Sequence, residues 1–391
     1  MLLQNGTGNA SPITSSVPSS SSLLSPNASA VYGIALEYEN DRKEHVAVDD
    51  DASPISIVYA LPSNSLPPSH HKGIVLLLHG CTHSAFKFFS PSQNCTKCVG
   101  LSEELQISRW VLEQGYIALA VTSYDWKSGC WGDVNDTRRI RKALHEFIHT
   151  THPELFKGNN TQPKIIAVGA SSGGAMAGRL LAAGMVDAAL VMVMGLPQKL
   201  LEKLLENQRD PTATMKHLYL APMVKDKGTA KTCRSNYQFL SQHIQKHPTT
   251  KLQVMLDETS CVPLPVTTEY LWSRVPGMTK EAAQILVDTL VEAQHLDPTT
   301  KLLILDPTRS LWRDVITAKN QNIPTSLLHT ENWNQKNPVP IIPSQTQLLW
   351  ERFDLTPGRS PLAKAFHRAW AFHEYCSESL APAFQVFEQR Q

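Results

Sequence analysis

The sequence lacks long apolar runs, a surplus of charge of either sign and a visible leader. Its longest apolar runs, residues 73–78 and 188–194, are far shorter than the roughly 20 residues that a membrane-spanning helix needs. The 36 basic and 35 acidic side chains leave a formal net charge of +1, with no long run of one sign. This balance predicts neither a nucleic-acid partner nor binding to an anionic membrane, and no transmembrane segment is expected.

Ser, Pro and Asn dominate the N-terminal residues, and such residues bury too little surface to offset the entropy of ordering. Residues 1–32 are therefore predicted to be a disordered tail, and no cleavable signal peptide is predicted, since no basic region precedes an apolar one. Two features favour a secretory lumen: four of the seven cysteines lie between Cys81 and Cys130, and there are six sequons, at Asn5, Asn9, Asn27, Asn94, Asn135 and Asn159. A cytosolic protein carries sequons at no cost, so the sequence favours neither compartment.

Short apolar runs alternate with helical stretches after the tail. With 42% hydrophobic and 18% charged residues, the chain has enough apolar material for a sizeable core. Strands alternating with helices predict an α/β fold with a doubly wound, mostly parallel sheet, and unbroken apolar strands suit its centre. Strands are predicted at residues 55–60, 73–78, 116–122, 164–168, 186–194, 217–224 and 252–256, and helices at residues 101–114, 137–148 and 173–183.

The strongest motif is the G-x-S-x-G pattern formed by Gly169, Ser171 and Gly173. It directly follows an apolar strand and precedes a helix of small residues, the context that identifies a nucleophile elbow. The tight turn strains the central serine and presents its oxygen at a helix N-terminus, where free N–H groups favour negative charge. The alternative is a Gly/Ser-rich turn that merely starts a helix, and the flanking elements favour the catalytic interpretation.

A second motif, His79-Gly80-Cys81, follows the strand at residues 73–78. In folds with a nucleophile elbow, the backbone at this place supplies an oxyanion donor. The backbone N–H groups of Cys81 and Ser172 are therefore the predicted oxyanion hole, an effect worth about 3–4 kcal/mol per donor. The alternative is a turn in which His79 and Gly80 simply end a strand.

Four segments together resemble a little-characterised, carboxylesterase-like branch of the α/β-hydrolase superfamily, over roughly residues 33–390. The elbow is specific to the superfamily, and the cysteine-bearing segments are specific to the branch. The resemblance implies a Ser–His–Asp triad and ester-type chemistry, and it implies no particular substrate. The segments are His79-Gly-Cys81, Cys95-x-x-Cys98-x-Gly-Leu101, Ser128-Gly-Cys-Trp131 and Gly169-Ala-Ser-Ser-Gly-Gly174.

The triad acid is expected after the second strand beyond the serine, because the triad order in this fold is Ser, Asp/Glu, His. The strand at residues 217–224 occupies that place, and Asp226 follows it. A carboxylate there would orient the imidazole and stabilise its cation. A solvated loop aspartate is the alternative for Asp226, and Asp187 and Asp257 are weaker candidates for the acid.

The base is expected just after the last strand, but residues 256–261 contain no histidine. His373 is predicted instead, because it precedes a C-terminal amphipathic helix and the resemblance places a His-Glu pair there. The alternative for His373 is a buried structural histidine. Six histidines follow Asp226: His243, His247, His295, His329, His367 and His373.

The pattern changes after Leu256, with no internal repeat. Helices are predicted at residues 279–296, 363–374 and 380–387, and a Pro- and Gln-rich loop at residues 332–344. With His373 as the base, an insertion separates it from the last strand, and such insertions usually form a lid or a pocket wall. The predicted organisation is a hydrolase core at residues 33–257, a helical insertion or lid at 258–365, and a C-terminal segment at 366–391 that completes the core.

Four cysteines lie on loops near the predicted site: Cys81, Cys95, Cys98 and Cys130. Two disulfides that pin the oxyanion loop are favoured, with Cys81–Cys130 and Cys95–Cys98 as one of three pairings. Zinc held by these cysteines and His83 is an alternative that lacks a second clean C-x-x-C pair, and a redox motif is disfavoured because no thioredoxin-type frame surrounds it. The other three, Cys233, Cys261 and Cys376, are predicted to be free core thiols.

The favoured function is a serine hydrolase that works through an acyl-serine, with small-molecule carboxylic esters as the predicted substrates. No cofactor and no metal are expected. The alternative is a non-catalytic α/β-hydrolase-like protein that uses its pocket for binding or its surface for a partner, because fold alone does not decide function. An acyltransferase with the same triad is a narrower third interpretation.

Overall fold

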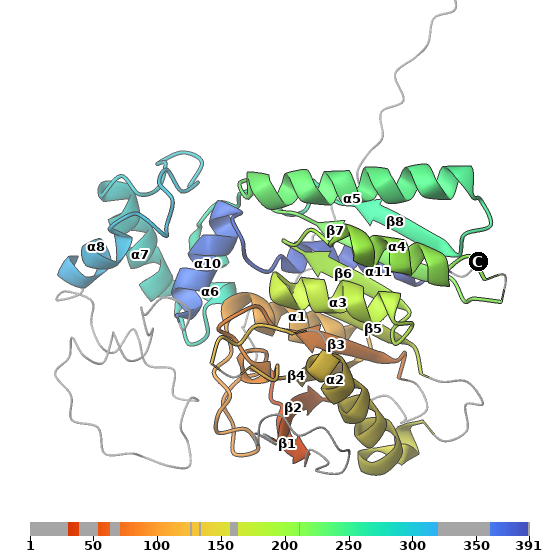
Figure 1. Cartoon of the computed structure of the whole chain (residues 1–391). Helices are drawn as coiled ribbons and strands as arrows, with labels where there is room; N and C mark the ends of the chain where they lie inside the picture. Colours follow the sequence, from red (N-terminus) through yellow and green to blue (C-terminus); the bar gives the residue numbers. More distant parts are fainter. Residues whose placement is uncertain are drawn as a thin grey trace, which may run out of the picture.

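The computed structural model describes residues 30–38, 54–62, 71–125, 127–132, 134–156, 163–210, 212–319 and 360–389. Most of the predicted N-terminal tail, the predicted loop at residues 332–344 and His329 lie outside these residues. Figure 1 shows the described elements as one sheet with helices on both faces and a group of helices at one end.

Eight strands form a single sheet in the order β1-β2-β4-β3-β5-β6-β7-β8. Strands β1 and β2 pair antiparallel to their neighbours, and all pairs from β4 to β8 are parallel. The predicted doubly wound, mostly parallel sheet is confirmed. The strands are Ile34–Tyr38 (β1), Ile55–Ala60 (β2), Ile74–Leu78 (β3), Ile117–Val121 (β4), Ile165–Ala170 (β5), Ala188–Met192 (β6), Lys216–Ala221 (β7) and Leu252–Leu256 (β8).

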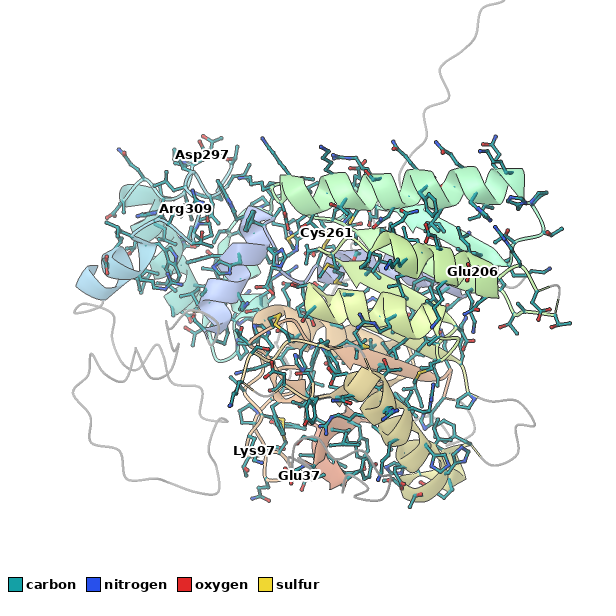
Figure 2. The ribbon with its side chains drawn as sticks, in the orientation of Figure 1. Glu37, Lys97, Glu206, Cys261, Asp297 and Arg309 are labelled. Atoms are coloured by element: carbon teal, nitrogen blue, oxygen red, sulfur yellow. A yellow bond between two sulfur atoms is a disulfide. The ribbon has the colours of Figure 1, made fainter. Side chains whose placement is uncertain are left out.

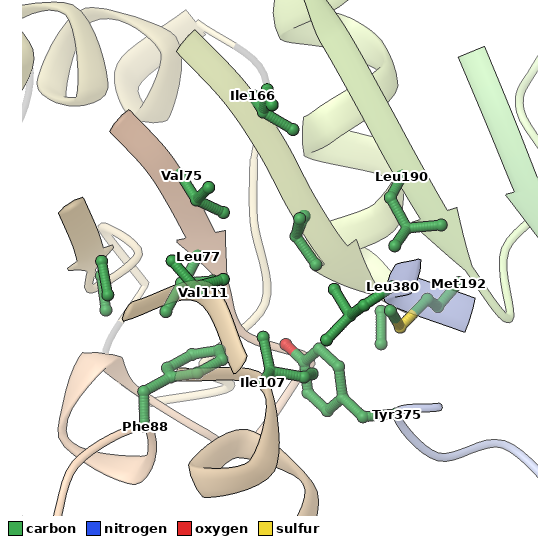
Figure 3. Packing of buried hydrophobic residues seen from close by; sticks show 14 of the residues in the cluster. Val75, Leu77, Phe88, Ile107, Val111, Ile166, Leu190, Met192, Tyr375 and Leu380 are labelled. Carbon is green, nitrogen blue, oxygen red and sulfur yellow. The ribbon is translucent and has the colours of Figure 1, made fainter. Parts of the chain in front are cut away.

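Alternate residues of each central strand pack into two apolar layers, because successive side chains of a strand point to opposite faces. Val75 and Leu77 face one layer together with helices α1 and α11, and this layer is drawn in Figure 3. Ile74 and Leu76 face the other layer together with helices α2 to α5. These helices are Ser102–Glu113 (α1), Val134–Glu146 (α2), Ser172–Ala182 (α3), Gln198–Asn207 (α4), Lys227–Lys246 (α5) and Leu380–Phe387 (α11).

The parallel register brings several strand ends to one edge of the sheet. Leu78 pairs with Gly169, and Met192 pairs with both Ala170 and Ala221. The loops after β3, β5 and β7 therefore start side by side, although they are far apart in the sequence. In open α/β sheets this carboxyl edge is where ligands bind.

A helical unit lies beyond this edge (Figure 1). Its helices share an apolar cluster of their own, separate from the two layers of the sheet. The cluster draws on residues 266–316 and 362–369, so the predicted end of the insertion at residue 365 falls inside one of these helices. The helices are Thr268–Arg274 (α6), Lys280–Glu292 (α7), Trp312–Lys319 (α8) and Pro361–Trp370 (α10).

Two predicted helices end earlier than expected. The helix predicted at residues 363–374 ends at Trp370, because Ala371 adopts the left-handed conformation with φ 59° and ψ 50°. The helix predicted at residues 279–296 ends at Glu292. Helices α4, α6 and α8 were not predicted, although the apolar spacing in α4 at positions 201, 204 and 205 is a usable helical signal.

Candidate active site

A sharp turn between β5 and α3 presents Ser171. This residue adopts φ 55° and ψ −124°, a conformation that side chains rarely take and that clusters at functional turns. A Cβ atom on Gly169 would overlap the Gly173 carbonyl, and one on Gly173 would overlap the Leu78 carbonyl, so both glycines are needed. The Ser171 N–H donates to the Met192 carbonyl at 3.0 Å, which fixes the turn to strand β6.

His373 lies within hydrogen-bonding distance of this serine. The Ser171 hydroxyl is 2.9 Å from His373 Nε2, and His373 Nδ1 is 2.8 Å from Asp226 Oδ2. When the carboxylate accepts from Nδ1–H, Nε2 is left to accept from the serine hydroxyl. The imidazole is 43% exposed, so one side of this hydrogen-bonded chain faces solvent.

Asp226 caps the N-terminus of helix α5, directly after strand β7. Its carboxylate accepts from the Thr229 N–H at 3.2 Å as well as from His373. Burial, the strongest single influence, raises the pKa of this carboxyl, but hydrogen bonds from His373 and Thr229 together bring the pKa below its ordinary value. Asp226 is therefore ionised at neutral pH.

The other candidate acids have partners of their own. Asp187 lies at the amino edge of the sheet, where its carboxylate pairs with Lys216 Nζ at 3.0 Å and accepts from the Ile165 N–H. Asp257 accepts from the N–H groups of residues 259 and 260 in a tight turn after β8. Within the described residues, neither carboxylate is bonded to an imidazole.

The other described histidines that follow Asp226 have other neighbours. His243 and His247 stack on each other at the end of α5, with ring centroids 4.5 Å apart. His295 is buried after α7, and His367 Nδ1 is 3.9 Å from a Glu374 carboxylate oxygen. Among the described residues, His373 is the histidine that bonds to the serine.

Two backbone N–H groups beside Ser171 have no acceptor among the described residues. They belong to Ser172, the first residue of α3, and to Cys81, in the loop after β3. Gly80 brings this loop close, since a Cβ atom built on it would lie 3.8 Å from Ser171 Cβ. Free, preorganised N–H groups at such a position are suited to hold a developing oxyanion.

The loop that carries Cys81 is fastened to residues 128–131. Cys81 forms a disulfide with Cys130, and the Thr82 N–H donates to a carbonyl of this segment at 2.8 Å. Gly129 has φ +62°, and a Cβ atom there would press on the backbone of residues 82 and 83. The disulfide and the close approach of the two segments limit the movement of the Cys81 N–H.

His79 supports the same loop through hydrogen bonds of its ring and its backbone. Its Nδ1 is 2.8 Å from the Gly80 carbonyl, its Nε2 accepts from the Ser123 N–H at 3.0 Å, and its own carbonyl accepts from the Trp131 indole N–H at 2.6 Å. Complete burial lowers the pKa of His79 to about 3, so the ring is neutral at physiological pH. The sequence pattern gave His79 only as a motif residue and did not indicate this structural role.

A third disulfide, between Cys261 and Cys376, corrects the prediction that both residues are free thiols. It joins the segment after β8 to the loop that carries His373. Sequence spacing does not reveal this pair, because the two cysteines are 115 positions apart and belong to no motif. Cys233 is buried and free, as predicted.

Cys95 and Cys98 form the remaining disulfide. Of the three possible pairings of the four cysteines, the structure has Cys81–Cys130 and Cys95–Cys98. All four of these sulfur atoms are bonded in pairs, which leaves none of them as a thiolate ligand for zinc. Within the described residues, no group of three or more His, Cys, Asp or Glu side chains is arranged to hold a metal ion.

No protein-family model and no curated protein sequence matches the chain. Among solved structures, it is similar to a thermostable esterase (14% identity, TM-score 0.36), over 58% of this chain and 55% of the esterase. It is also similar to the acylaminoacyl peptidase of Pyrococcus horikoshii (12% identity, TM-score 0.37), over 59% of this chain and 37% of the peptidase. A third similarity, over 59% of this chain and 81% of the other, is to a feruloyl esterase module from Clostridium thermocellum in complex with sinapinate (12% identity, TM-score 0.41).

The chain thus spans about half the length of the thermostable esterase and little more than a third of the peptidase. These similarities concern the fold alone. The strand order, the parallel pairing from β4 to β8 and the sharp turn between β5 and α3 are those of the α/β-hydrolase fold, and this chain has that fold. No helix within the described ranges is long and apolar enough to cross a bilayer.

Proposed function

We propose that this chain is a serine hydrolase that cleaves carboxylic esters through an acyl-serine intermediate. The observation that carries the proposal is the hydrogen-bonded chain from Ser171 through His373 to Asp226, with distances of 2.9 Å and 2.8 Å. A nucleophile, a base and an orienting carboxylate in this order are the groups that acyl transfer requires. The free N–H groups of Cys81 and Ser172 add electrostatic stabilisation of the oxyanion that forms during acyl transfer.

In the acylation step, Ser171 Oγ attacks the ester carbonyl carbon while its proton passes to His373 Nε2. The carbonyl oxygen becomes an oxyanion, which the two N–H groups stabilise by about 3–4 kcal/mol each. Asp226, ionised at neutral pH, stabilises the imidazolium. The bond to the alcohol oxygen then breaks, and His373 returns the proton to this leaving group.

In the deacylation step, water replaces the alcohol. His373 Nε2 takes a proton from the water, whose oxygen attacks the acyl carbon and forms a second oxyanion at the same N–H groups. The bond between the acyl carbon and Ser171 Oγ breaks, and Oγ takes the proton back from the imidazolium. The products are a carboxylic acid and an alcohol, and the enzyme returns to its starting state.

Esters are the favoured class because of the leaving group. An alcohol oxygen departs from the tetrahedral intermediate with less help from proton transfer than an amine nitrogen does. The site requires no group beyond those described above, and the 43% exposure of the His373 side chain gives water access for the second step.

Labelling with a fluorophosphonate tests this function. Ser171 Oγ would attack the phosphorus and displace fluoride, which leaves a stable phosphonyl group on the serine. We expect the wild type to be labelled at Ser171 and Ser171→Ala to be unlabelled. Ser235→Ala, which removes an exposed hydroxyl on helix α5, is the matched control and should be labelled like the wild type.

The same experiment separates an enzyme from a binding protein. His373→Ala should slow labelling by at least about 10³-fold, because the residues of a triad act as a unit. Folded wild type that shows no labelling would contradict the proposal and favour the non-catalytic alternative. Labelling at a different serine would remove Ser171 from the account.

A further inference from the structure

The position of His373 depends on its side-chain hydrogen bonds and on the loop that carries it. Its ring bonds to Ser171 and Asp226 and lies beside the Phe372 ring, with centroids 6.4 Å apart. Its backbone has φ 43°, a conformation that a non-glycine residue adopts only when its surroundings enforce it. The loop at residues 371–376, here called the base loop, is held in part by contacts of its own residues: the Ala371 carbonyl accepts from the Lys225 N–H at 3.1 Å, Glu374 pairs with Lys364 at 2.9 Å, and the Tyr375 hydroxyl donates to the Leu78 carbonyl at 2.7 Å. Residues at its two ends add further contacts.

Arg368, in the last turn of α10, is fully buried at one end of this loop. Its guanidinium donates to a Glu378 carboxylate oxygen at 2.8 Å, to the Val262 carbonyl at 3.0 Å and to the Ser260 carbonyl at 3.1 Å. A planar guanidinium presents its donors from three nitrogens in a fixed fork and so reaches three separated acceptors, whereas the donors of an ammonium group radiate from a single nitrogen. The two carbonyls belong to the residues on either side of Cys261, so Arg368 binds the backbone of the segment that follows β8.

The contacts of Arg368 close the base loop and attach it. Arg368 precedes the loop and Glu378 follows it, ten positions later, so their ion pair joins its two ends. The carbonyl contacts then attach the closed loop to residues 260–262, and the Cys261–Cys376 disulfide joins the same two segments. Figure 2 shows Cys261 between helix α10 and the sheet.

The same junction reaches the helical unit and the core. Glu378 also pairs with Arg274 of helix α6, and Arg274 pairs in turn with Glu103, a fully buried residue of helix α1. Buried charges persist only when they are paired and hydrogen-bonded, and here each has a partner of opposite sign. The network is therefore built to fix the relative positions of three segments.

We propose that Arg368 is a positioning residue of the His373 imidazole. It holds the base loop against residues 260–262, so that Nε2 stays at hydrogen-bonding distance from Ser171 although the base does not follow the last strand directly. This inference rests on the proposed function. A shift of about 1 Å in such a group lowers the reaction rate on the order of 10²-fold.

Arg368→Lys tests the proposal, because it keeps the charge and loses the fork of donors. We expect kcat for a p-nitrophenyl ester to fall on the order of 10²-fold while KM stays within about twofold, since the transition state and not substrate binding is affected. Arg234→Lys is the matched control: its guanidinium forms an exposed ion pair with Glu258, near the same segment, and its kcat should not change.

A double mutant separates positioning from general support of the fold. In the His373→Ala background, Arg368→Lys should cause no further loss of the residual activity, because both changes act through one group. The low-field proton signal of His373 Nδ1–H in its bond to Asp226 should broaden or vanish in Arg368→Lys and persist in Arg234→Lys. Two results would overturn the proposal. One is that Arg368→Lys lowers activity by the same factor in the His373→Ala background as in the wild type. The other is that folded Arg368→Lys shows an unchanged proton signal and an unchanged kcat.

Two further measurements keep the test decisive. If Arg368→Lys does not fold, Glu378→Asp shortens the carboxylate side chain and weakens the same loop closure while it keeps the negative charge opposite Arg368, and the same loss of kcat and signal is expected. Fluorophosphonate labelling of the wild type runs in parallel. No labelling of the wild type would refute the proposed function and this inference with it, whereas a labelled wild type with an unaffected Arg368→Lys would refute this inference alone.

Discussion

The serine and the base of the candidate site meet at one hydrogen bond but are positioned by different means. Ser171 is held by its neighbours in sequence, through the end of a strand, the start of a helix and two glycines that fit only without a side chain. His373 is 202 positions away and is held by a disulfide and by the contacts of a buried arginine. One region is specified locally, and the other is specified by the tertiary structure.

This difference has a consequence for stability and activity. A locally specified turn forms together with the sheet, so damage to it should lower both stability and activity. A base loop held by a few distant contacts can be displaced while the sheet stays intact. Side-chain changes at the base loop that keep its disulfide should therefore lower activity while the sheet persists, whereas loss of the Cys261–Cys376 disulfide should lower both activity and stability. The predictions below test this contrast.

The largest effect is expected from Asp226, which belongs to the locally specified region. Asp226→Asn retains an acceptor for the Thr229 N–H but removes the charge that orients the imidazole, so kcat should fall about 10⁴-fold with little change in fold. Asp187→Asn, at the amino edge, is the matched control and should leave kcat nearly unchanged. Steady-state ester hydrolysis measures both, and wild-type turnover in Asp226→Asn would exclude it as the acid.

The Cys261–Cys376 disulfide should come next, because it closes a loop of 115 positions. In the chain-entropy model such a bridge is worth about 4–5 kcal/mol, whereas one that spans three positions is worth about 1–2 kcal/mol. We expect Cys261→Ala/Cys376→Ala to lose more stability in urea unfolding than Cys95→Ala/Cys98→Ala, and also to lose turnover. Equal losses of turnover for the two double variants would contradict the special role of the base loop.

Gly173 tests the local region by steric overlap. Gly173→Ala would place a Cβ atom against the Leu78 carbonyl, which should destabilise the fold by about 1–3 kcal/mol and distort the turn at Ser171. Gly228→Ala, at a helical position with open space around it, should stabilise by up to about 1 kcal/mol. Thermal unfolding compares the two, and a Gly173→Ala variant as stable and active as the wild type would refute the account of the turn.

The effect that is smallest at neutral pH is a pH dependence of stability that arises from His79. The folded state keeps this ring neutral down to its pKa of about 3, whereas the unfolded chain protonates it near 6.5. The unfolded state then binds more protons between these values, so stability is complete above pH 6.5 and falls as the pH approaches 3. In His79→Gln the slope of the unfolding midpoint between pH 4 and 6.5 should be shallower, and an identical slope would show that His79 does not cause it.

Much of the locally specified region could be predicted from the sequence. Central strands are unbroken apolar runs, so the hydrophobic pattern is enough to predict them. Gly169 and Gly173 bracket a serine between a strand and a helix, so the residue types are enough to predict the turn. Asp226 follows from its place after β7. These features share one property, namely that the residues that determine the structure are adjacent in the sequence.

The base loop shows why the rest could not be predicted. No glycine or asparagine marks the end of helix α10, so nothing signals that Ala371 turns left-handed. Arg368 looks like any arginine on an amphipathic helix, and only the packed structure buries it between two carbonyls. Cys261 and Cys376 carry no spacing that identifies them as partners. In each case the deciding contact lies far away in the sequence.

The central claim is that Ser171 carries the acyl group and that His373, although supplied from a distant loop, activates it. The most direct measurement is rapid mixing with p-nitrophenyl butyrate, acid quenching and mass analysis of the peptides. We predict a butyryl group on the peptide that contains Ser171, absent in His373→Ala under the same conditions. Ester hydrolysis with no acylated Ser171 peptide, or with the acyl group on another residue, would contradict the account.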